Sequence, residues 1–147
     1  DVIVQKAWTQ GWTNVVDAIV QTLTRHGSPT CYVEINGIGE IAYTELLEAY
    51  GNTKPWRTTN QSKKNIVSAL ILSFNTDRIR IPRDEELLDE LQYFEDKGAT
   101  LNGGRKFGAK SGKHDDRVMS LAICNYHLNS MTTQVIKRTK RKVSTKY

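Results

Sequence analysis

At residues 31–37 the chain reads Cys31-Tyr32-Val33-Glu34-Ile35-Asn36-Gly37. The β-branched and apolar residues of this stretch are typical of a buried strand, and the glycine opens a turn. Residues 14–23 before it and residues 40–50 after it carry apolar side chains at helical spacing. Strands and helices that alternate over short loops are typical of a parallel sheet with right-handed crossovers. We therefore expect an α/β fold.

The same reasoning predicts further elements on both sides of this stretch. A β-branched run predicts a strand before the first helix, and two more extended segments follow the second helix. Asp84 is a typical N-cap residue, and a glycine-rich segment precedes the last helix, which starts near His114. The predicted elements are strands at 2–8 and 78–81, a weak strand or extended loop at 54–60, helices at 62–74 and 85–94, and a flexible hairpin or loop at 98–112.

Length and charge limit the kinds of protein that this chain can be. Its 147 residues are enough for one domain with a real core. Residues 1–101 hold 10 basic and 14 acidic residues, whereas residues 102–147 hold 11 basic and 2 acidic ones. A basic C-terminal third beside acidic residues suits a polyanionic partner. We expect a domain over residues 1–133 and a basic tail over residues 134–147.

Other features argue against a secreted or membrane protein. The longest apolar run, residues 66–72, is far too short to span a bilayer, and no signal peptide is visible. Cys31 and Cys124 each lie in an apolar segment, so we expect reduced thiols in the core. The chain starts at Asp1, inside a strand-like run, and we therefore expect a fragment of a longer protein.

Three acids in two segments are candidate metal ligands. Glu34 lies near the end of the predicted buried strand, where a carboxylate is costly unless it is paired, protonated or bound to a metal. Asp115 and Asp116 lie at a predicted helix N-terminus. Oxygen ligands without a His/Cys cluster favour Mg²⁺ or Mn²⁺ over zinc. Two such ions can activate a water molecule and stabilise the leaving oxygen of a phosphodiester, which predicts hydrolysis of a nucleic-acid backbone.

Two stretches of the sequence together resemble a known family. They are Tyr32-Val33-Glu34-Ile35-Asn36-Gly37-Ile38-Gly39 and His114-Asp115-Asp116-Arg117-Val118-Met119-Ser120-Leu121. At this separation they resemble the nuclease domain of the large terminase subunit of tailed bacteriophages, and the elements between them agree in order. The resemblance covers roughly residues 1–130.

The resemblance implies a fold, an activity and a set of residues. The fold is ribonuclease-H-like, a mixed sheet flanked by helices, here expected to lack its first two strands and the catalytic Asp on the first of them. The activity is cleavage of concatemeric double-stranded viral DNA with two Mg²⁺ or Mn²⁺ ions. Glu34 and Asp116 match catalytic metal ligands, and Asp115 matches an accessory ligand or a helix cap.

The resemblance also implies partners and a location. The partners are an N-terminal ATPase domain of the same polypeptide, the terminase small subunit and the portal protein, with no membrane. The location is the host cytoplasm, on the procapsid.

Several alternatives remain open at this point. The lysines and arginine near the acids are predicted either to contact DNA phosphates or to be solvated loop charge: Arg105, Lys106, Lys110 and Lys113. His114 is either a loop residue or a proton donor. The basic run at 137–142 is either a disordered tail or a DNA or portal contact. The G-x-G-x-x-A spacing at residues 37–42 fits a dinucleotide site, but no acid ends a strand about 20 residues on.

Two other function classes compete with the terminase interpretation. One is another ribonuclease-H-like DNA nuclease, such as a junction resolvase or a transposase. The other is a non-catalytic DNA- or portal-binding module that retains the fold without its full set of acids.

Overall fold

A computed structural model describes residues 11–99 and 105–144 of the chain, with side chains described as far as residue 130. The chain divides into two compact units. The first unit holds the described residues up to Ser62, and the second begins at Lys63. The strand predicted at residues 2–8 lies outside the described residues.

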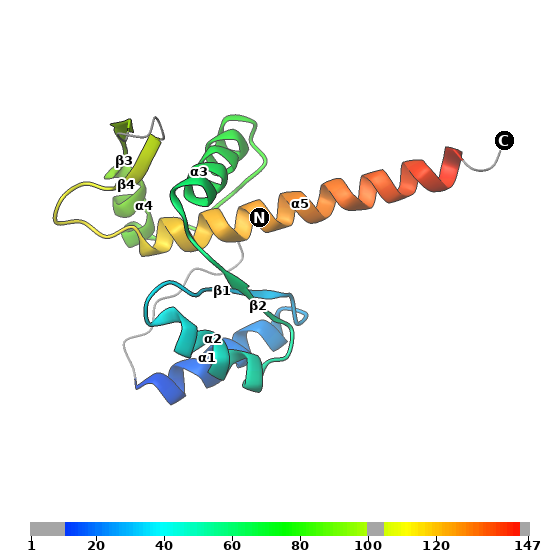
Figure 1. The fold of residues 1–147 in the computed structure, drawn as a ribbon, viewed down its shortest axis with the longest axis horizontal. Helices are drawn as coiled ribbons and strands as arrows, with labels where there is room; N and C mark the ends of the chain where they lie inside the picture. Colours follow the sequence, from blue (N-terminus) through cyan, green and yellow to red (C-terminus); the bar gives the residue numbers. More distant parts are fainter. Residues whose placement is uncertain (1–10, 100–104, 145–147) are drawn as a thin grey trace. The chain divides into compact units, whose positions relative to one another are not determined.

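The first unit alternates helices and strands. Its elements are α1 (Trp12–Arg25), β1 (Cys31–Glu34), α2 (Gly39–Ala49) and β2 (Thr53–Trp56). Helix α1 extends two residues beyond each end of the predicted range 14–23. It ends at Arg25, because Gly27 adopts a φ of 83° and the Ser28 N–H donates to the Leu23 carbonyl at 2.9 Å. Helix α2 packs on both strands and on α1 (Figure 1). Val15, Val16 and Leu46 are the buried apolar residues of this unit.

Strands β1 and β2 pair in parallel, in register from Cys31 opposite Thr53 to Glu34 opposite Trp56. The β1–α2–β2 order therefore confirms the predicted crossover unit. The pairing continues past the strands, since the Ile35 N–H donates to the Trp56 carbonyl at 2.8 Å. The predicted strand is confirmed, but it was expected to be buried, and all four residues of β1 are half-buried.

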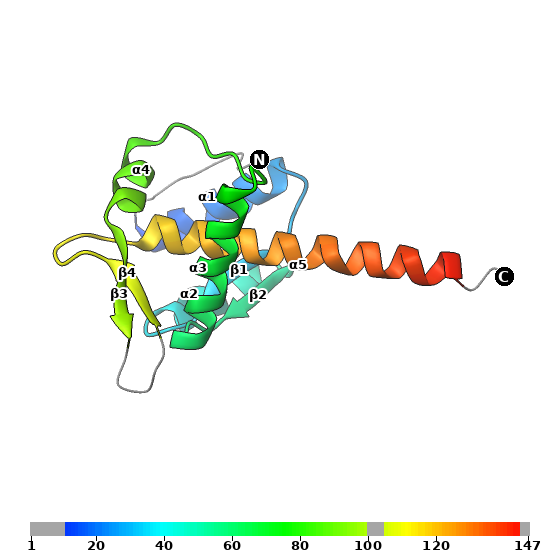
Figure 2. The ribbon, with the colours of Figure 1, turned by 90° about the horizontal axis from the view of Figure 1, so that it is seen from above.

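The second unit is built on two helices, α3 (Asn60–Asn75) and α5 (Asp116–Ser144), and the unit boundary falls in the first turn of α3. Figure 2 shows α3 crossing α5 within this unit. Their facing sides supply most of its core at helical spacing. The buried residues are Ile66, Val67 and Leu70 of α3 and Val118, Met119, Leu121, Ala122 and Ile123 of α5.

Helix α4 (Glu85–Gln92) and a hairpin complete this unit. Asp84 caps α4 as predicted, with its Oδ1 accepting the Leu87 N–H at 2.8 Å, and α4 packs on α5. The strands β3 (Phe94–Ala99) and β4 (Arg105–Ala109) pair antiparallel with an irregularity between Asp96 and Ala99. The predicted hairpin is confirmed, although its first strand starts at Phe94, which was expected to end the preceding helix.

Two further predictions concern the segment after α3 and the C-terminal region. The strand predicted at residues 78–81 does not form. Asp77 adopts a φ of 52°, and the Arg78 N–H donates to the Ser73 carbonyl at 2.9 Å, so the start of this segment is used to end α3. The predicted boundary after residue 133 falls inside α5, which continues to Ser144.

None of the described helices combines the length and the apolar character needed to cross a bilayer.

Candidate metal and nucleic-acid site

The Glu34 half of the predicted site lies in the first unit, at the end of β1. Glu34 is half-buried, and no hydrogen bond or ion pair joins its carboxylate to another described residue of that unit. The chain folds back closely here, because a Cβ atom built on Gly39 would overlap the Glu34 carbonyl oxygen. Glycine at position 39 therefore allows α2 to start directly against the strand end that carries Glu34.

Asn36 extends the parallel pairing by one more step beside Glu34. Its side-chain amide donates to the Thr58 carbonyl, and its side-chain oxygen accepts the Thr58 N–H, both at 2.8 Å. These two hydrogen bonds resemble those between paired strands, and they hold the segment after β2 next to the end of β1. The sequence did not indicate this partner for Asn36.

Asp115 lies in the second unit and is already engaged. Its Oδ2 atom lies 2.9 Å from Nζ of Lys63 on α3, and the two side chains are 27% and 21% exposed. Gly108 of β4 packs against this ion pair, since a Cβ built there would lie 3.5 Å from Asp115 Oδ2 and 3.8 Å from Lys63 Nζ. Lys63 therefore neutralises Asp115 locally, and the sequence did not indicate this pairing.

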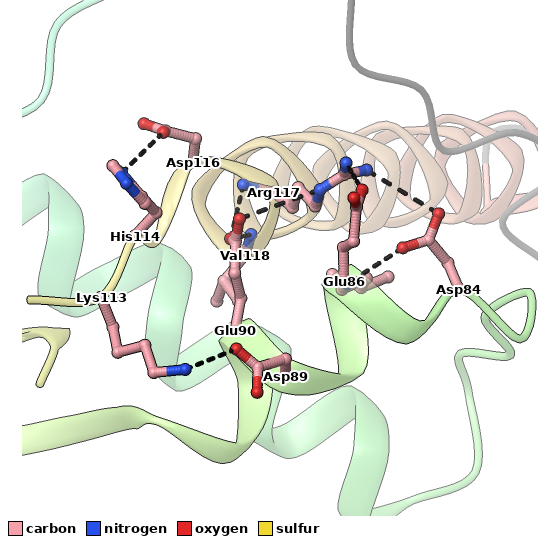
Figure 3. A network of polar contacts seen from close by, with 10 residues as sticks. Asp84, Glu86, Asp89, Glu90, Lys113, His114, Asp116, Arg117 and Val118 are labelled. Carbon is pink, nitrogen blue, oxygen red and sulfur yellow. Dashed lines mark hydrogen bonds and ion pairs between the residues drawn. The ribbon is translucent and has the colours of Figure 1, made fainter.

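Asp116 is the first residue of α5 and is almost fully exposed. Its side chain is 90% exposed, and Nδ1 of His114, which is 84% exposed, lies 3.9 Å from its Oδ2. At this distance the contact is at most a weak, solvated ion pair. In Figure 3 the Asp116 carboxylate points towards His114 and away from the Arg117 side chain. Its oxygens are therefore available to a cation.

The N-terminus of α5 is capped from another helix. Glu90 of α4 accepts the backbone N–H of Arg117 at 2.8 Å and that of Val118 at 3.2 Å through one oxygen, Oε2. Asp115 was predicted to be an accessory metal ligand or a helix cap. Its carboxylate does not cap α5, because it pairs with Lys63, and its role as an accessory ligand stays a prediction. Sequence reasoning missed Glu90, and the acidic face of the α4 segment was the only signal for it.

The four predicted DNA-binding residues differ in their surroundings. Arg105 pairs with Asp96 at 2.9 Å, and Lys113 pairs with Asp89 at 3.0 Å and lies 4.2 Å from the centre of the Tyr93 ring. Lys106 and Lys110 are exposed and have no ion pair with a described residue. The hairpin and the turn after it thus present two exposed lysines that have no ion pair with a described residue.

The metal-ligand chemistry of each unit is limited. Within the described part of each unit, no group of three or more His, Cys, Asp or Glu side chains is placed so that it could hold a metal ion. Glu34 belongs to one unit and the two aspartates to the other, so their joint role remains a prediction. Cys31 and Cys124 are not in a disulfide, and Cys124 is exposed, so it is not the core thiol that we expected. Burial raises the pKa of the Cys31 thiol, which disfavours the thiolate that a soft metal needs.

Comparison with known proteins gives this arrangement a context. Over 114 residues the chain is 31% identical to the large terminase subunits of Thermus phage G20c and Thermus virus P23-45. The solved large terminase nuclease of phage G20c with bound magnesium matches 79% of the chain with a TM-score of 0.64 and 30% identity. The chain is a homologue of the nuclease domain of phage large terminase subunits. No family model matches it.

Further solved structures agree with this identification. The G20c nuclease with bound cobalt matches with a TM-score of 0.63 and 31% identity, and the Thermus phage P74-26 nuclease domain with 0.61 and 28%. The predicted terminase resemblance and the ribonuclease-H-like fold class are therefore confirmed. The chain spans 23% of the length of the large terminase subunits and 61% of the magnesium-bound nuclease.

Proposed function

We propose that this domain is the metal-dependent endonuclease of a phage DNA-packaging terminase. The observation that carries the proposal is the match to a terminase nuclease with bound magnesium, with 30% sequence identity and a TM-score of 0.64. The acids of this chain are of the right kind for the same chemistry. Carboxylate oxygens prefer hard divalent cations, and the exposed Asp116 carboxylate is not consumed by its own helix.

Glu34 and Asp116 hold Mg²⁺ or Mn²⁺ in this proposal, with Asp115 as an accessory ligand. Two bound ions supply a water molecule that is more easily deprotonated and a positive charge beside the leaving oxygen of a phosphodiester. The side chains of the domain position the substrate. Lys106 and Lys110, exposed on and after β4, contact backbone phosphates of double-stranded DNA.

The partners of the domain are inferred from the homology to large terminase subunits. We infer that the domain acts with an ATPase domain of the same polypeptide, with the terminase small subunit and with the portal protein. The place of action is the host cytoplasm, where concatemeric DNA is cut as a procapsid is filled. A cut made by this domain would separate one genome length from the next.

A second candidate function is a non-catalytic DNA- or portal-binding module. The ion pair between Lys63 and Asp115 favours it, because a lysine there supplies a positive charge without a metal. A junction resolvase or transposase is the remaining catalytic alternative, and the terminase homology makes it the weaker one.

Cleavage of supercoiled plasmid DNA by the full protein distinguishes these functions. We expect nicking and linearisation with Mg²⁺ or Mn²⁺ and none with EDTA. Glu34→Gln and Asp116→Asn should each lower the rate by at least about a hundredfold, as for other groups that stabilise developing charge. Glu40→Gln, an exposed acid in the first turn of α2, is the control and should cleave normally. If Glu34→Ala leaves cleavage unchanged, the proposal is wrong.

A further inference from the structure

The first turn of α5 carries Asp116 and follows directly on Asp115, and it is held by a carboxylate that belongs to α4. The first backbone N–H groups of a helix have no partner in the helix itself and create a positive end of its dipole. An acid at that position would ordinarily turn its side chain back onto these groups. Here Glu90 occupies them, and its bonds to the N–H groups of Arg117 and Val118 measure 2.8 Å and 3.2 Å.

Arg117 ties the same turn to α4 a second time. Its guanidinium is surrounded by three carboxylates: it bonds Glu86, lies 3.7 Å from Asp84, and lies 3.9 Å from Oε1 of Glu90. The side chains of Arg117 and Glu90 are only 15% and 13% exposed, so solvent screens their interaction less than that of a surface pair. Figure 3 shows the Arg117 side chain reaching along α4 to these acids.

The arrangement has a consequence for the two aspartates. Because Glu90 satisfies the helix end, neither Asp115 nor Asp116 is needed as a cap. Asp115 pairs with Lys63, and the Asp116 carboxylate is 90% exposed. The buried Leu87, one turn before Glu90, packs α4 in place and so fixes where the Glu90 carboxylate lies. The backbone turn from which the Asp116 side chain extends is thus held through α4.

We propose that Glu90 is a positioning residue. Together with the ion pairs of Arg117, it holds the first turn of α5 so that the carboxylate oxygens of Asp116 stay free to bind a divalent cation. The inference rests on the proposed function, because it takes Asp116 as a metal ligand. Residues that orient a metal ligand without touching the metal typically change metal affinity by about 10- to 100-fold when they are replaced. Glu90 does so through the backbone of the ligand's helix.

Mn²⁺ binding by the full protein, measured as free Mn²⁺ by electron paramagnetic resonance, tests the inference without relying on cleavage. We expect Glu90→Ala to raise the Mn²⁺ dissociation constant about 10-fold. Glu90→Gln keeps an oxygen that accepts from the N–H groups but loses the negative charge, so its loss of Mn²⁺ affinity should be smaller and still measurable. Glu85→Ala is the matched control, since Glu85 is an exposed acid on the same helix, and it should bind Mn²⁺ as the unaltered protein does.

Three further readouts interpret each outcome. Circular dichroism shows which variants are folded, and amide hydrogen exchange should be faster at Arg117 and Val118 in both Glu90 variants. A folded Glu90→Ala protein with unchanged Mn²⁺ affinity overturns the inference, even if it unfolds at a lower temperature. If Glu90→Ala does not fold, Glu90→Gln decides in the same way.

Asp116→Ala separates this inference from the proposed function. If Asp116→Ala leaves Mn²⁺ binding intact, the proposed function fails and the positioning role fails with it. If Asp116→Ala abolishes binding while folded Glu90 variants bind normally, only the positioning role is wrong.

Discussion

The Nζ atom of Lys63 lies 2.9 Å from Oδ2 of Asp115, and each side chain is less than one-third exposed. This ion pair joins α3 to the residue that precedes α5. Its surroundings are partly shielded, because Gly108 lies beside both side chains and the Phe94 ring centre lies 5.8 Å from Nζ. Lys63 is therefore a structural link of the second unit as well as a local counter-charge.

Replacing Lys63 should weaken the second unit. Lys63→Gln leaves Asp115 without its cation, and the expected loss is about 1 kcal/mol of unfolding free energy, at the upper end for ion pairs that are still partly solvated. Urea unfolding followed by circular dichroism measures it. Lys64→Gln, at the exposed neighbouring position, should change stability by less than about 0.5 kcal/mol. Equal effects from the two variants would contradict a specific role for Lys63.

Gly39 should not tolerate a side chain. A Cβ at this position overlaps the Glu34 carbonyl oxygen, which is backbone and cannot rotate away. Gly39→Ala should therefore cost about 1–3 kcal/mol in thermal or urea unfolding, as overpacking does in other proteins. Gly51→Ala is the control, because a Cβ there meets no atom within 4 Å. A Gly39→Ala protein as stable as Gly51→Ala would show that α2 does not start so close to β1.

Leu87 should be the most sensitive position of α4. It is fully buried, whereas its neighbour Leu88 is 44% exposed. Leu87→Ala should lower the unfolding free energy by about 2–5 kcal/mol, since it removes apolar contacts and leaves a cavity. Leu88→Ala should cost much less. A reversal of this order in urea unfolding would mean that α4 packs against α5 through a different face.

Lys106 and Lys110 should carry more of the DNA affinity than Lys113. The first two have no ion pair with a described residue, while Lys113 is held by Asp89 and Tyr93. Lys106→Ala with Lys110→Ala should weaken binding to a DNA duplex and reduce the slope of log affinity against log salt by about 0.9 per lost phosphate contact. Fluorescence anisotropy at several salt concentrations measures both. An unchanged salt slope would exclude phosphate contacts by these lysines.

The elements that the sequence predicted correctly are those with local signals. Helix α4 was found from Asp84, whose cap bond reaches only to Leu87, and α3 from apolar residues spaced along one face. The parallel pairing of β1 and β2 followed from the order of elements. These features depend on residues a few positions apart, which a sequence pattern records.

The errors have two sources: a local turn that ends α3, and contacts between residues far apart in the chain. The run at 78–81 has β-branched residues, but the Arg78 N–H closes the end of α3 and the segment is not a strand. Glu90 caps a helix that begins 26 positions further along the chain, and Lys63 pairs with an acid 52 positions away. No local pattern distinguishes these residues from other charged residues on a helix surface. The candidate site was thus proposed from its acids, while the side chains that contact these acids and their helix were not predicted.

The central claim is that Glu34 and Asp116 bind the same divalent cations. Mn²⁺ titration of the full protein tests it directly, with Glu34→Gln, Asp116→Asn and the double variant compared with the unaltered protein, each checked for folding by circular dichroism. We expect each single variant to lose the same Mn²⁺ binding and the double variant to lose little more, because residues that act on one site are not additive. Normal Mn²⁺ binding in either folded single variant, or separate losses that simply add, would contradict the claim.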